Sequence, residues 1–583
     1  MYFKLNNFAG IAPGVDDRRL SDQFGTVASD IDFESGALVP ITDNSVNTTL
    51  SNSNRRSVFR YKTGNTSYWL QWNEEVDVVK GPIPNDAFDR LYWTGEDYPR
   101  VGIGSTSNSM ISGSGSYPAT SFKLGIPAPS TAPTTNKTGT ADSTQTPFDV
   151  SYVFTFVSAI GEEGPPSPPS TVIELTDAEN VVVTMGATPS GNYNFSSGAL
   201  RRIYRSNTGS NNTRFQFVGE VPIATTTFTD TKNGSELGEL LPSETWIGPP
   251  DDDTNLYPSG PMIGLIAVAN GIMAGFTGNR LCFSEPFLPH AWPVSYRITL
   301  ESDIVAIGAT GNGVVALTEG DPYFVTGTDP SAMSAIKLDI QQSCVNKNSV
   351  VDMGGYLLYA GPDGLVAAGG NEARLVTQGL ISAKQWNASF APTTIRAFRH
   401  ENTYVAFNTT VTSTTPPVTL STGWVYDPRA QESALSTLAL GNTANVRGGF
   451  EKDDDGELYI IVGNELQEYR NGTTKKTMRF RSKKFVTPQP TSFSWVSVDA
   501  EGYPVSVRVI ADDTTIASYT LSKSGNVFTQ ATTIPSGIAD VSLQEPIMRL
   551  PADVGREWQI EVSGAVTVNE VCIAQSIDEV KAL

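Results

Sequence analysis

Short runs in which apolar and polar residues alternate, separated by turn residues, dominate this chain. Residues 152–157 place aromatic side chains on one face and Val and Thr on the other, the pattern of a strand buried in a core. Residues 493–498 alternate more strictly between apolar and polar positions. No long stretch repeats its apolar residues at the helical period of 3.6. The pattern predicts an almost purely β protein with less than roughly 10% helix, and short helical turns at residues 382–386 and 576–583.

Prolines end several of the predicted strands in a similar way. Residues 280–283 begin a strand, and Pro286, Pro289 and Pro293 forbid its continuation because proline lacks the amide donor that a strand ladder needs. Fainter versions of this exit follow residues 90–95 and 323–327. Repeated short strands with similar exits predict radial repetition, as in a β-propeller. Two stacked sheets remain the alternative packing.

The chain is expected to contain several domains, because 583 residues exceed what one hydrophobic core accommodates. A proline-rich, linker-like stretch at residues 127–133 precedes a run of strands with turn signals between them. This run resembles a fibronectin type III module. The predicted domains are an N-terminal platform with the first propeller strands, a fibronectin type III-like β-sandwich, a β-propeller and a C-terminal β-sandwich, at residues 1–123, 124–244, 245–477 and 478–583.

Composition and charge limit the partners of the chain. The 40 basic and 61 acidic residues give a net charge of −21, which argues against stable binding to nucleic acid or to an anionic membrane. The three cysteines lie far apart without metal-ligand spacing, so small buried residues are expected. We expect no membrane segment and no signal peptide, because no apolar run is long enough to span a bilayer and residues 1–7 lack the long apolar core of a signal peptide. We therefore expect it to be made in the cytoplasm.

Candidate catalytic chemistry is sparse. Only His290 and His400 could act as histidine bases, and neither accompanies a nucleophile motif. Surface or interface positions are expected for both. Two carboxylates could serve a glycosidase, although no sialidase-type blade turn occurs. The run at residues 451–456 fails as an EF-hand loop, because Val462 stands where the bidentate Glu belongs. Residues 251–253 could form a solvated linker or bind calcium, and the sequence leaves both alternatives open. We expect no enzyme activity, no cofactor and no metal site.

One cluster of cations stands out against the acidic background. Six basic residues occur within residues 475–484, namely Lys475, Lys476, Arg479, Arg481, Lys483 and Lys484. If this segment is a strand, Arg479, Arg481 and Lys483 share one face and offer a row of partners for phosphates or carboxylates. A DNA-facing or subunit-facing role is one interpretation. The alternative is a solvated edge strand that its lysines protect from aggregation.

Several motifs together resemble the tail nozzle proteins of short-tailed phages, the tail tubular protein B-like family. The resemblance covers most of the chain, with motifs of a structural kind, and residues 124–244 form an insertion that such proteins need not share. The matching segments are residues 8–20, 28–38, 279–293, 315–323, 342–345, 359–365, 548–551 and 557–564.

The resemblance implies a structural virion protein at the distal end of a short tail. Six copies would form a ring that docks on the tail adaptor protein, can anchor tail fibres and conducts double-stranded DNA during genome ejection. Six chains would carry 6 × (−21) = −126 formal charges, so DNA in transit would be repelled and not retained. A host-surface glycan-binding tail protein (an adhesin), with Trp69 and Trp72 as stacking platforms, is the alternative. A glycan hydrolase is a third.

Overall fold

The computed structural model describes residues 1–105, 109–208, 213–311, 313–411, 419–430, 434–440, 445–452 and 456–582. The chain is all-β, with 47% of residues in strands and 6% in helices. This confirms the β class and the low helix content that the alternation predicts. The acidic run at residues 453–455 lies outside the described residues.

The chain divides into two compact units. The first unit combines residues 1–58 with residues 339–583, and the second comprises residues 59–338. The predicted segments 1–123 and 245–477 are each divided between the two units. Residues 1–58 belong to the first unit because their strands pair with strands near the end of the chain. Proximity in the sequence alone would have grouped them with residues 59–123.

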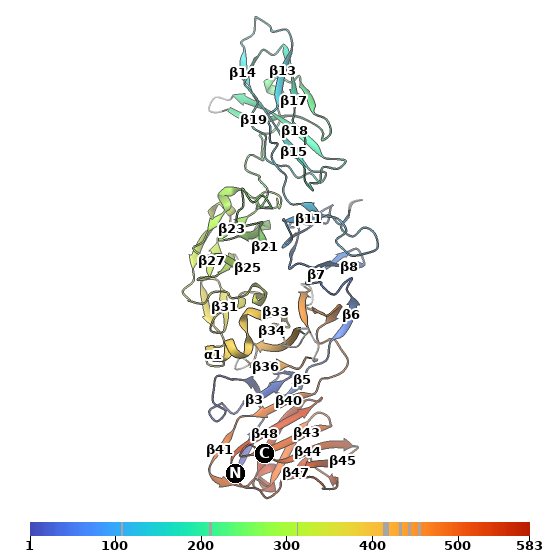
Figure 1. The fold of residues 1–583 in the computed structure, drawn as a ribbon, viewed down its shortest axis with the longest axis vertical. Coiled ribbons are helices and arrows are strands. Elements are labelled where there is room, and N and C mark those ends of the chain that lie inside the picture. Colours follow the sequence, from blue (N-terminus) through green and yellow to red (C-terminus); the bar gives the residue numbers. More distant parts are fainter. Residues whose placement is uncertain are drawn as a thin grey trace. The chain divides into compact units, whose positions relative to one another are not determined.

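Antiparallel sheets of four consecutive strands recur in the second unit (Figure 1). Each strand in such a sheet pairs with the next strand along the chain, so every sheet is an antiparallel meander. The hairpin that opens this part of the chain consists of β7 (Ser57–Thr63) and β8 (Thr66–Trp72). The four-stranded sheets are β9 (Asp77–Lys80), β10 (Leu91–Thr94), β11 (Arg100–Gly102) and β12 (Phe122–Lys123); β21 (Ile263–Ala267), β22 (Met273–Thr277), β23 (Arg280–Phe283) and β24 (Ile298–Thr299); and β25 (Ile304–Thr310), β26 (Gly313–Thr318), β27 (Tyr323–Thr326) and β28 (Ser334–Lys337).

Strand β23 ends at Phe283, before Pro286, as the missing amide donors predict. Its loop then turns back on itself. The indole of Trp292 is fully buried and donates a hydrogen bond to the carbonyl of Pro289 at 2.7 Å. The proline-rich exit is therefore a packed loop with its own buried anchor.

Residues 124–244 form two principal sheets around one core. Tyr152, Phe154 and Phe156 on one sheet and Val181 and Val183 on the other belong to the same buried cluster. The predicted strand at residues 152–157 is confirmed in full. The strands are β13 (Thr134–Gly139), β17 (Glu179–Thr184) and β20 (Thr227–Asp230); β15 (Tyr152–Val157), β18 (Leu200–Thr208) and β19 (Thr213–Pro222); and the small pair β14 (Phe148–Val150) and β16 (Ile173–Leu175).

The inserted segment is tied to its surroundings by close backbone packing and by a buried ion pair. A Cβ atom on Gly125 would lie 2.5 Å from the Cα of Gly248, so the entering and leaving chains touch through two glycines. The guanidinium of Arg90 lies 3.0 Å from the carboxylate of Glu162, with both side chains less than 10% exposed. Burial raises the pKa of Glu162 to about 7, against the opposing effect of Arg90.

The first unit continues the four-stranded pattern. One of its sheets is completed by a strand from the other end of the chain, because Ser45–Thr49 (β6) pairs antiparallel with Glu465–Glu468 (β39). That sheet also contains β37 (Val446–Glu451) and β38 (Leu458–Val462), and another four-stranded sheet consists of β29 (Val351–Asp352), β30 (Leu357–Ala360), β31 (Leu365–Gly369) and β32 (Glu372–Leu375). The next four strands, β33 (Ile395–His400), β34 (Thr403–Val411), β35 (Thr419–Asp427) and β36 (Ala434–Leu438), form one end of a longer sheet.

A long sheet runs through the first unit and joins distant parts of the sequence. Phe24–Ser29 (β3) lies between β36, to which it is parallel, and Met478–Ser482 (β40), to which it is antiparallel. From β40 the sheet continues through β48, β43, β44, β45 and β46. These strands are β48 (Gly555–Gly564), β43 (Val505–Ala511), β44 (Thr514–Ser524), β45 (Val527–Ile534) and β46 (Val541–Leu543), with β2 (Ala9–Ile11) and β41 (Phe485–Thr491) pairing beside the main path.

A second sheet shares a core with the end of this long sheet. Tyr2–Leu5 (β1) pairs with Val568–Ala574 (β49), which explains why Figure 1 shows both chain ends within this unit. Val507 and Val562 of the long sheet and Val496 and Ile573 of the second sheet lie in one buried cluster. The other strands of the second sheet are β42 (Trp495–Ala500) and β47 (Ile547–Arg549), and a separate small pair is β4 (Ile31–Asp32) with β5 (Val39–Pro40).

The helical turns lie where the sequence places them. Ala383–Gln385 (α1) begins after Ser382, whose hydroxyl accepts a hydrogen bond from the Gln385 amide, and a π-turn follows at Trp386–Phe390. Ile577–Lys581 (α2) has the same kind of cap at Ser576. The remaining helical segments are 3-10 turns at Gly234–Glu236, Ala269–Gly271, Val294–Tyr296, Pro330–Ala332, Lys347–Ser349 and Pro392–Thr394.

Candidate functional site

The cationic segment at residues 475–484 contains an interior strand. Strand β40 pairs with β3 on one side and with β48 on the other. Both of its edges are occupied, so the interpretation as a protected edge strand is wrong. The partner β3 comes from residues 24–29, a pairing that the local sequence of the cationic segment cannot indicate.

Three guanidinium groups surround one buried carboxylate on this sheet. Register places Arg481, Glu561 and Arg508 directly opposite one another on three neighbouring strands. Glu561 is only 4% exposed, and its Oε2 lies 2.6 Å from Arg481 Nη2 and 2.8 Å from Arg479 Nη2. Its Oε1 lies 3.4 Å from Arg508 Nη1. Burial alone would raise the pKa of Glu561, but hydrogen bonds from the two nearer arginines hold it below its usual value.

The lysines of the segment leave this face. Lys483 follows the end of β40 and pairs with Asp22 at 2.9 Å, so it does not extend the row of Arg479 and Arg481. Lys484 lies 2.6 Å from Asp513, which raises the lysine's pKa. Lys476 lies 3.5 Å from the buried Asp30. Lys475 is exposed, and its backbone forms a bridge to Thr42.

The cluster therefore has less free charge than the sequence implies. Arg479, Arg481, Arg508 and Glu561 together carry 3 − 1 = +2 formal charges. The arginine side chains are 45%, 30% and 52% exposed, so their outer edges remain open to a partner. A phosphate that approached them would compete with Glu561. Such a site is suited to weak, salt-sensitive contact with an anion.

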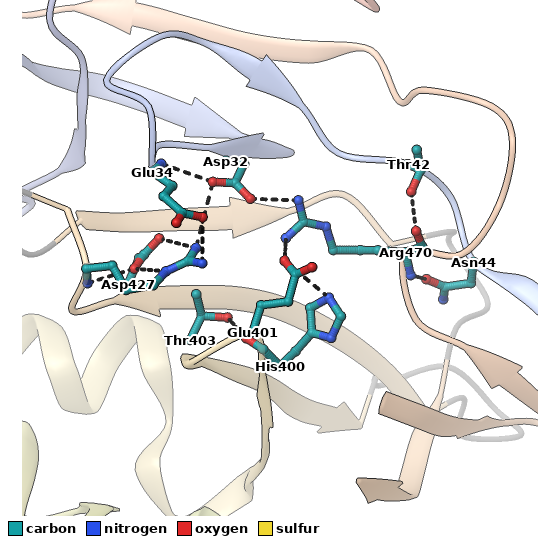
Figure 2. Close-up of polar contacts among 10 residues, drawn as sticks. Asp32, Glu34, Thr42, Asn44, His400, Glu401, Thr403, Asp427 and Arg470 are labelled. Atoms are coloured by element: carbon teal, nitrogen blue, oxygen red, sulfur yellow. Dashed lines mark hydrogen bonds and ion pairs between the residues drawn. The ribbon is translucent and has the colours of Figure 1, made fainter. Parts of the chain in front are cut away.

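A second network of charges connects residues 32–34, near the N-terminus, with charged side chains at residues 427–470 (Figure 2). Asp32 accepts a hydrogen bond from Arg470 at 2.8 Å, and Glu34 pairs with Arg429 at 2.7 Å. Arg429 also holds Asp427 at 2.8 Å, at the end of β35. Burial opposes ionisation of Asp32, yet Arg470 and neighbouring donors keep its pKa below the usual value. The pairs of Asp32 with Arg470 and of Glu34 with Arg429 join residues 438 and 395 positions apart and have a positioning role.

Both histidines are buried, which corrects the expectation of surface or interface positions. His290 is 4% exposed beside Trp246, with 5.9 Å between the ring centroids. His400 is 8% exposed and meets the ring of Tyr469 edge-on at 5.0 Å. Burial lowers the pKa of each to about 4. In the described part of the chain, Nε2 of His290 and Nδ1 of His400 have no hydrogen-bond partner.

The other residues considered for a chemical role are buried or form ion pairs within the chain. All three cysteines are free and buried, as predicted. Trp72 is 3% exposed and packs on Trp93, so it cannot serve as a stacking platform for a glycan. Asp251 and Asp252 pair with Lys123. Among the described residues, no group of three or more His, Cys, Asp or Glu side chains is placed to hold a metal ion.

Sequence reasoning missed Glu561 and Arg508. Both lie at polar positions of alternating strands, at residues 555–564 and 505–511, and that alternation was the available signal for their shared face. The register that brings them to Arg481 depends on pairings of Glu561 with Arg481 and Arg508 across 80 and 53 positions, which the alternation does not specify. In the portion of the chain that the structure describes, no helix has the length and apolar character needed to cross a bilayer.

Comparisons with known proteins show only remote likeness. No protein family and no curated protein matches the sequence. Among solved structures, the N-terminal domain of Nup159 matches at 9% identity and a TM-score of 0.23, covering 62% of this chain and 87% of that one. The dihydro-heme d1 dehydrogenase NirN in complex with DHE matches at 10% identity and 0.21, covering 70% and 74%. The extracellular domain of a hybrid two component system from B. thetaiotaomicron matches at 10% and 0.20, covering 86% and 47%.

Proposed function

We propose that this chain is a structural, non-enzymatic protein of a short phage tail. In this proposal six copies form the distal nozzle, a ring-shaped conduit that docks on the tail adaptor protein, anchors tail fibres and passes double-stranded DNA during genome ejection. The protein would be made in the host cytoplasm and act in the virion. The resemblance of the sequence motifs to nozzle proteins is the origin of the proposal.

The pairing of β6 with β39 is the observation that carries the architectural part of the proposal. Four-stranded antiparallel sheets follow one another along the described chain, and the last of them takes its fourth strand from residues 45–49. A circle of such sheets closes when a strand from its start completes its final sheet, which leaves few exposed edges. We infer a β-propeller built from these sheets, interrupted by a fibronectin type III-like sandwich and followed by a C-terminal sandwich.

Charge supports the conduit part of the proposal. The net charge of −21 opposes retention of DNA, and the most cationic segment is largely neutralised by carboxylates of the same chain. A lining that held phosphates tightly would release counterions, gain affinity and slow DNA passage. The remaining charge of the arginine cluster suits brief contact, either with DNA or with an acidic surface of a neighbouring subunit.

Labelling of virions tests where the protein acts. Antibodies raised against the purified chain should decorate the distal tip of the short tail in electron micrographs, and they should block genome ejection without blocking adsorption. Antibodies that block adsorption while leaving ejection from adsorbed particles intact would favour the adhesin. Decoration of the capsid, or of no virion part, would contradict a tail role altogether.

A further inference from the structure

A pocket of about 490 Å³ lies over one face of the sheet β29–β32. It belongs wholly to the first unit and lies apart from the arginine cluster on β40. Strands β30, β31 and β32 form its floor and one rim, and the end of β35 forms a wall through Tyr426 and Pro428. The volume falls within the range of about 300–1,000 Å³ that is usual for small-molecule sites.

Small residues in the middle strand create this hollow. Register places Leu358, Ala367 and Arg374 in one row across the three strands. In the next row, Gly369 lies opposite Glu372 and beside Tyr356. A Cβ on Gly369 would lie 2.8 Å from the Cβ of Tyr356, so glycine is needed where the tyrosine crosses the sheet. Larger side chains at these two central positions would fill the space.

The floor of the pocket is apolar, and its rim carries charge. Leu358 is fully buried and Ala367 is 7% exposed, and both belong to the hydrophobic core beneath. Glu372 and Arg374 occupy alternate positions of the edge strand β32, so both side chains lie on the pocket's face. Both are exposed. Within the described ranges, neither has an ion-pair or hydrogen-bond partner.

The phenol of Tyr356 adds a donor beside this pair. The ring is half-buried, and burial raises its pKa while the guanidinium groups of Arg374 and Arg399 oppose the rise. The hydroxyl therefore stays protonated at neutral pH. The pocket thus combines an unpaired cation, an unpaired carboxylate, a neutral hydroxyl and an apolar floor in one concave surface.

We propose that this pocket binds an acidic sugar residue. The carboxylate of such a ring would pair with Arg374, its hydroxyls would donate to Glu372, and its apolar face would lie against the ring of Tyr356. Each unpaired group of the pocket has a complement in that ligand. Inorganic phosphate fits less well, because Glu372 would repel a dianion and the apolar floor would contribute nothing. The proposal does not depend on the ring or conduit described above.

Calorimetric titration of the full-length protein with glucuronic acid, glucose and inorganic phosphate tests the proposal. Glucuronic acid should bind with a Kd of about 1 mM or below. Glucose and phosphate should each bind at least about tenfold more weakly. Arg374→Ala should weaken glucuronic acid binding about tenfold or more, with partial retention in Arg374→Lys. Lys384→Ala removes an exposed cation from α1 and should change nothing.

A variant that fills the hollow separates pocket binding from surface attraction. Ala367→Leu leaves every rim charge in place, and it should abolish binding while circular dichroism and the unfolding midpoint confirm a folded chain. Should that variant prove unstable, Glu372→Gln gives a second reading, because it should weaken binding of glucuronic acid and strengthen binding of phosphate. Equal binding of phosphate and glucuronic acid, or loss of affinity in Lys384→Ala equal to that in Arg374→Ala, would overturn the proposal. Absence of detectable glucuronic acid binding at millimolar concentration would overturn it as well.

Discussion

Arg481 and Glu561 face each other across two hydrogen-bonded strands, with Nη2 of the arginine 2.6 Å from Oε2 of the glutamate. The same carboxylate also holds Arg479 and Arg508. One acidic group thus limits how much positive charge the segment at residues 475–484 presents. Most of the cations that lie in a row in the sequence at residues 475–484 form ion pairs with carboxylates of the same folded chain.

Glu561→Gln should destabilise the first unit by about 2 kcal/mol. The substitution leaves three guanidinium groups around a neutral side chain, and their partial exposure to water limits the cost. Urea unfolding monitored by fluorescence measures the change. Glu545→Gln, which removes an exposed partner of Lys581, is the matched control and should shift stability by less than about 0.5 kcal/mol. Equal effects of the two substitutions would show that the arginine cluster has no special role in stability.

The same substitution should change the response to DNA. With Glu561 neutral, the local charge rises from +2 to +3, so affinity for duplex DNA at low salt should increase. The slope of log affinity against log salt should steepen by about one unit. Fluorescence anisotropy with a labelled duplex at several salt concentrations measures both quantities. Unchanged slopes would mean that DNA does not contact these arginines, and tight sequence-specific binding by the wild type would contradict a conduit.

Acidification should destabilise the protein through its buried histidines. The pKa of His290 falls from about 6.5 in the unfolded chain to about 4 in the folded chain, so between these values the unfolded state binds more protons. Stability from this group is fully present above pH 6.5 and is lost as the pH falls toward 4, by roughly 3 kcal/mol at most. The measurement compares wild type with His290→Phe over this range.

The variant should show a shallower loss of stability than the wild type. Glu162, whose pKa rises to about 7, contributes in the opposite direction in both proteins, and the comparison cancels its effect. Parallel curves for the two proteins would refute a buried neutral His290.

Gly125→Ala should destabilise the second unit far more than Gly161→Ala. Both glycines have positive φ, +90° and +82°, so each substitution incurs left-handed strain of roughly 1 kcal/mol. Only at Gly125 would the new Cβ meet another backbone, that of Gly248, which raises the expected cost to about 3 kcal/mol. Thermal unfolding of both variants gives the difference. Equal losses would mean that the entering and leaving chains do not touch.

Residues 124–244 should fold when expressed alone, because their two sheets enclose a core of their own. In the whole protein Glu162→Gln breaks the buried pair with Arg90 and should be destabilising. In the isolated segment Arg90 is absent, so the same substitution should be neutral or stabilising. Unfolding of the whole protein and of the isolated segment, monitored by circular dichroism, measures the effect of the substitution on the stability of each. An isolated segment that stays unfolded would show that its core depends on the host chain.

The strands were easier to predict from the sequence than their partners. Tyr152–Val157 and the end of β23 before Pro286 follow from local alternation and from the missing proline amides. The insertion of β3 between β36 and β40 does not, because the pairing of Ser29 with Thr437 joins residues more than four hundred positions apart. For the same reason the sequence displayed the cations of residues 475–484 but not Glu561, Asp22 or Asp513, which neutralise them.

The most direct test of the proposed conduit is the shape of the purified particle. Negative-stain electron microscopy of the full-length protein, with mass photometry of the same sample, reports both geometry and copy number. We predict closed rings of six chains with a stain-filled central channel. A population of single chains at every concentration up to tens of micromolar, or particles without a channel, would contradict the account.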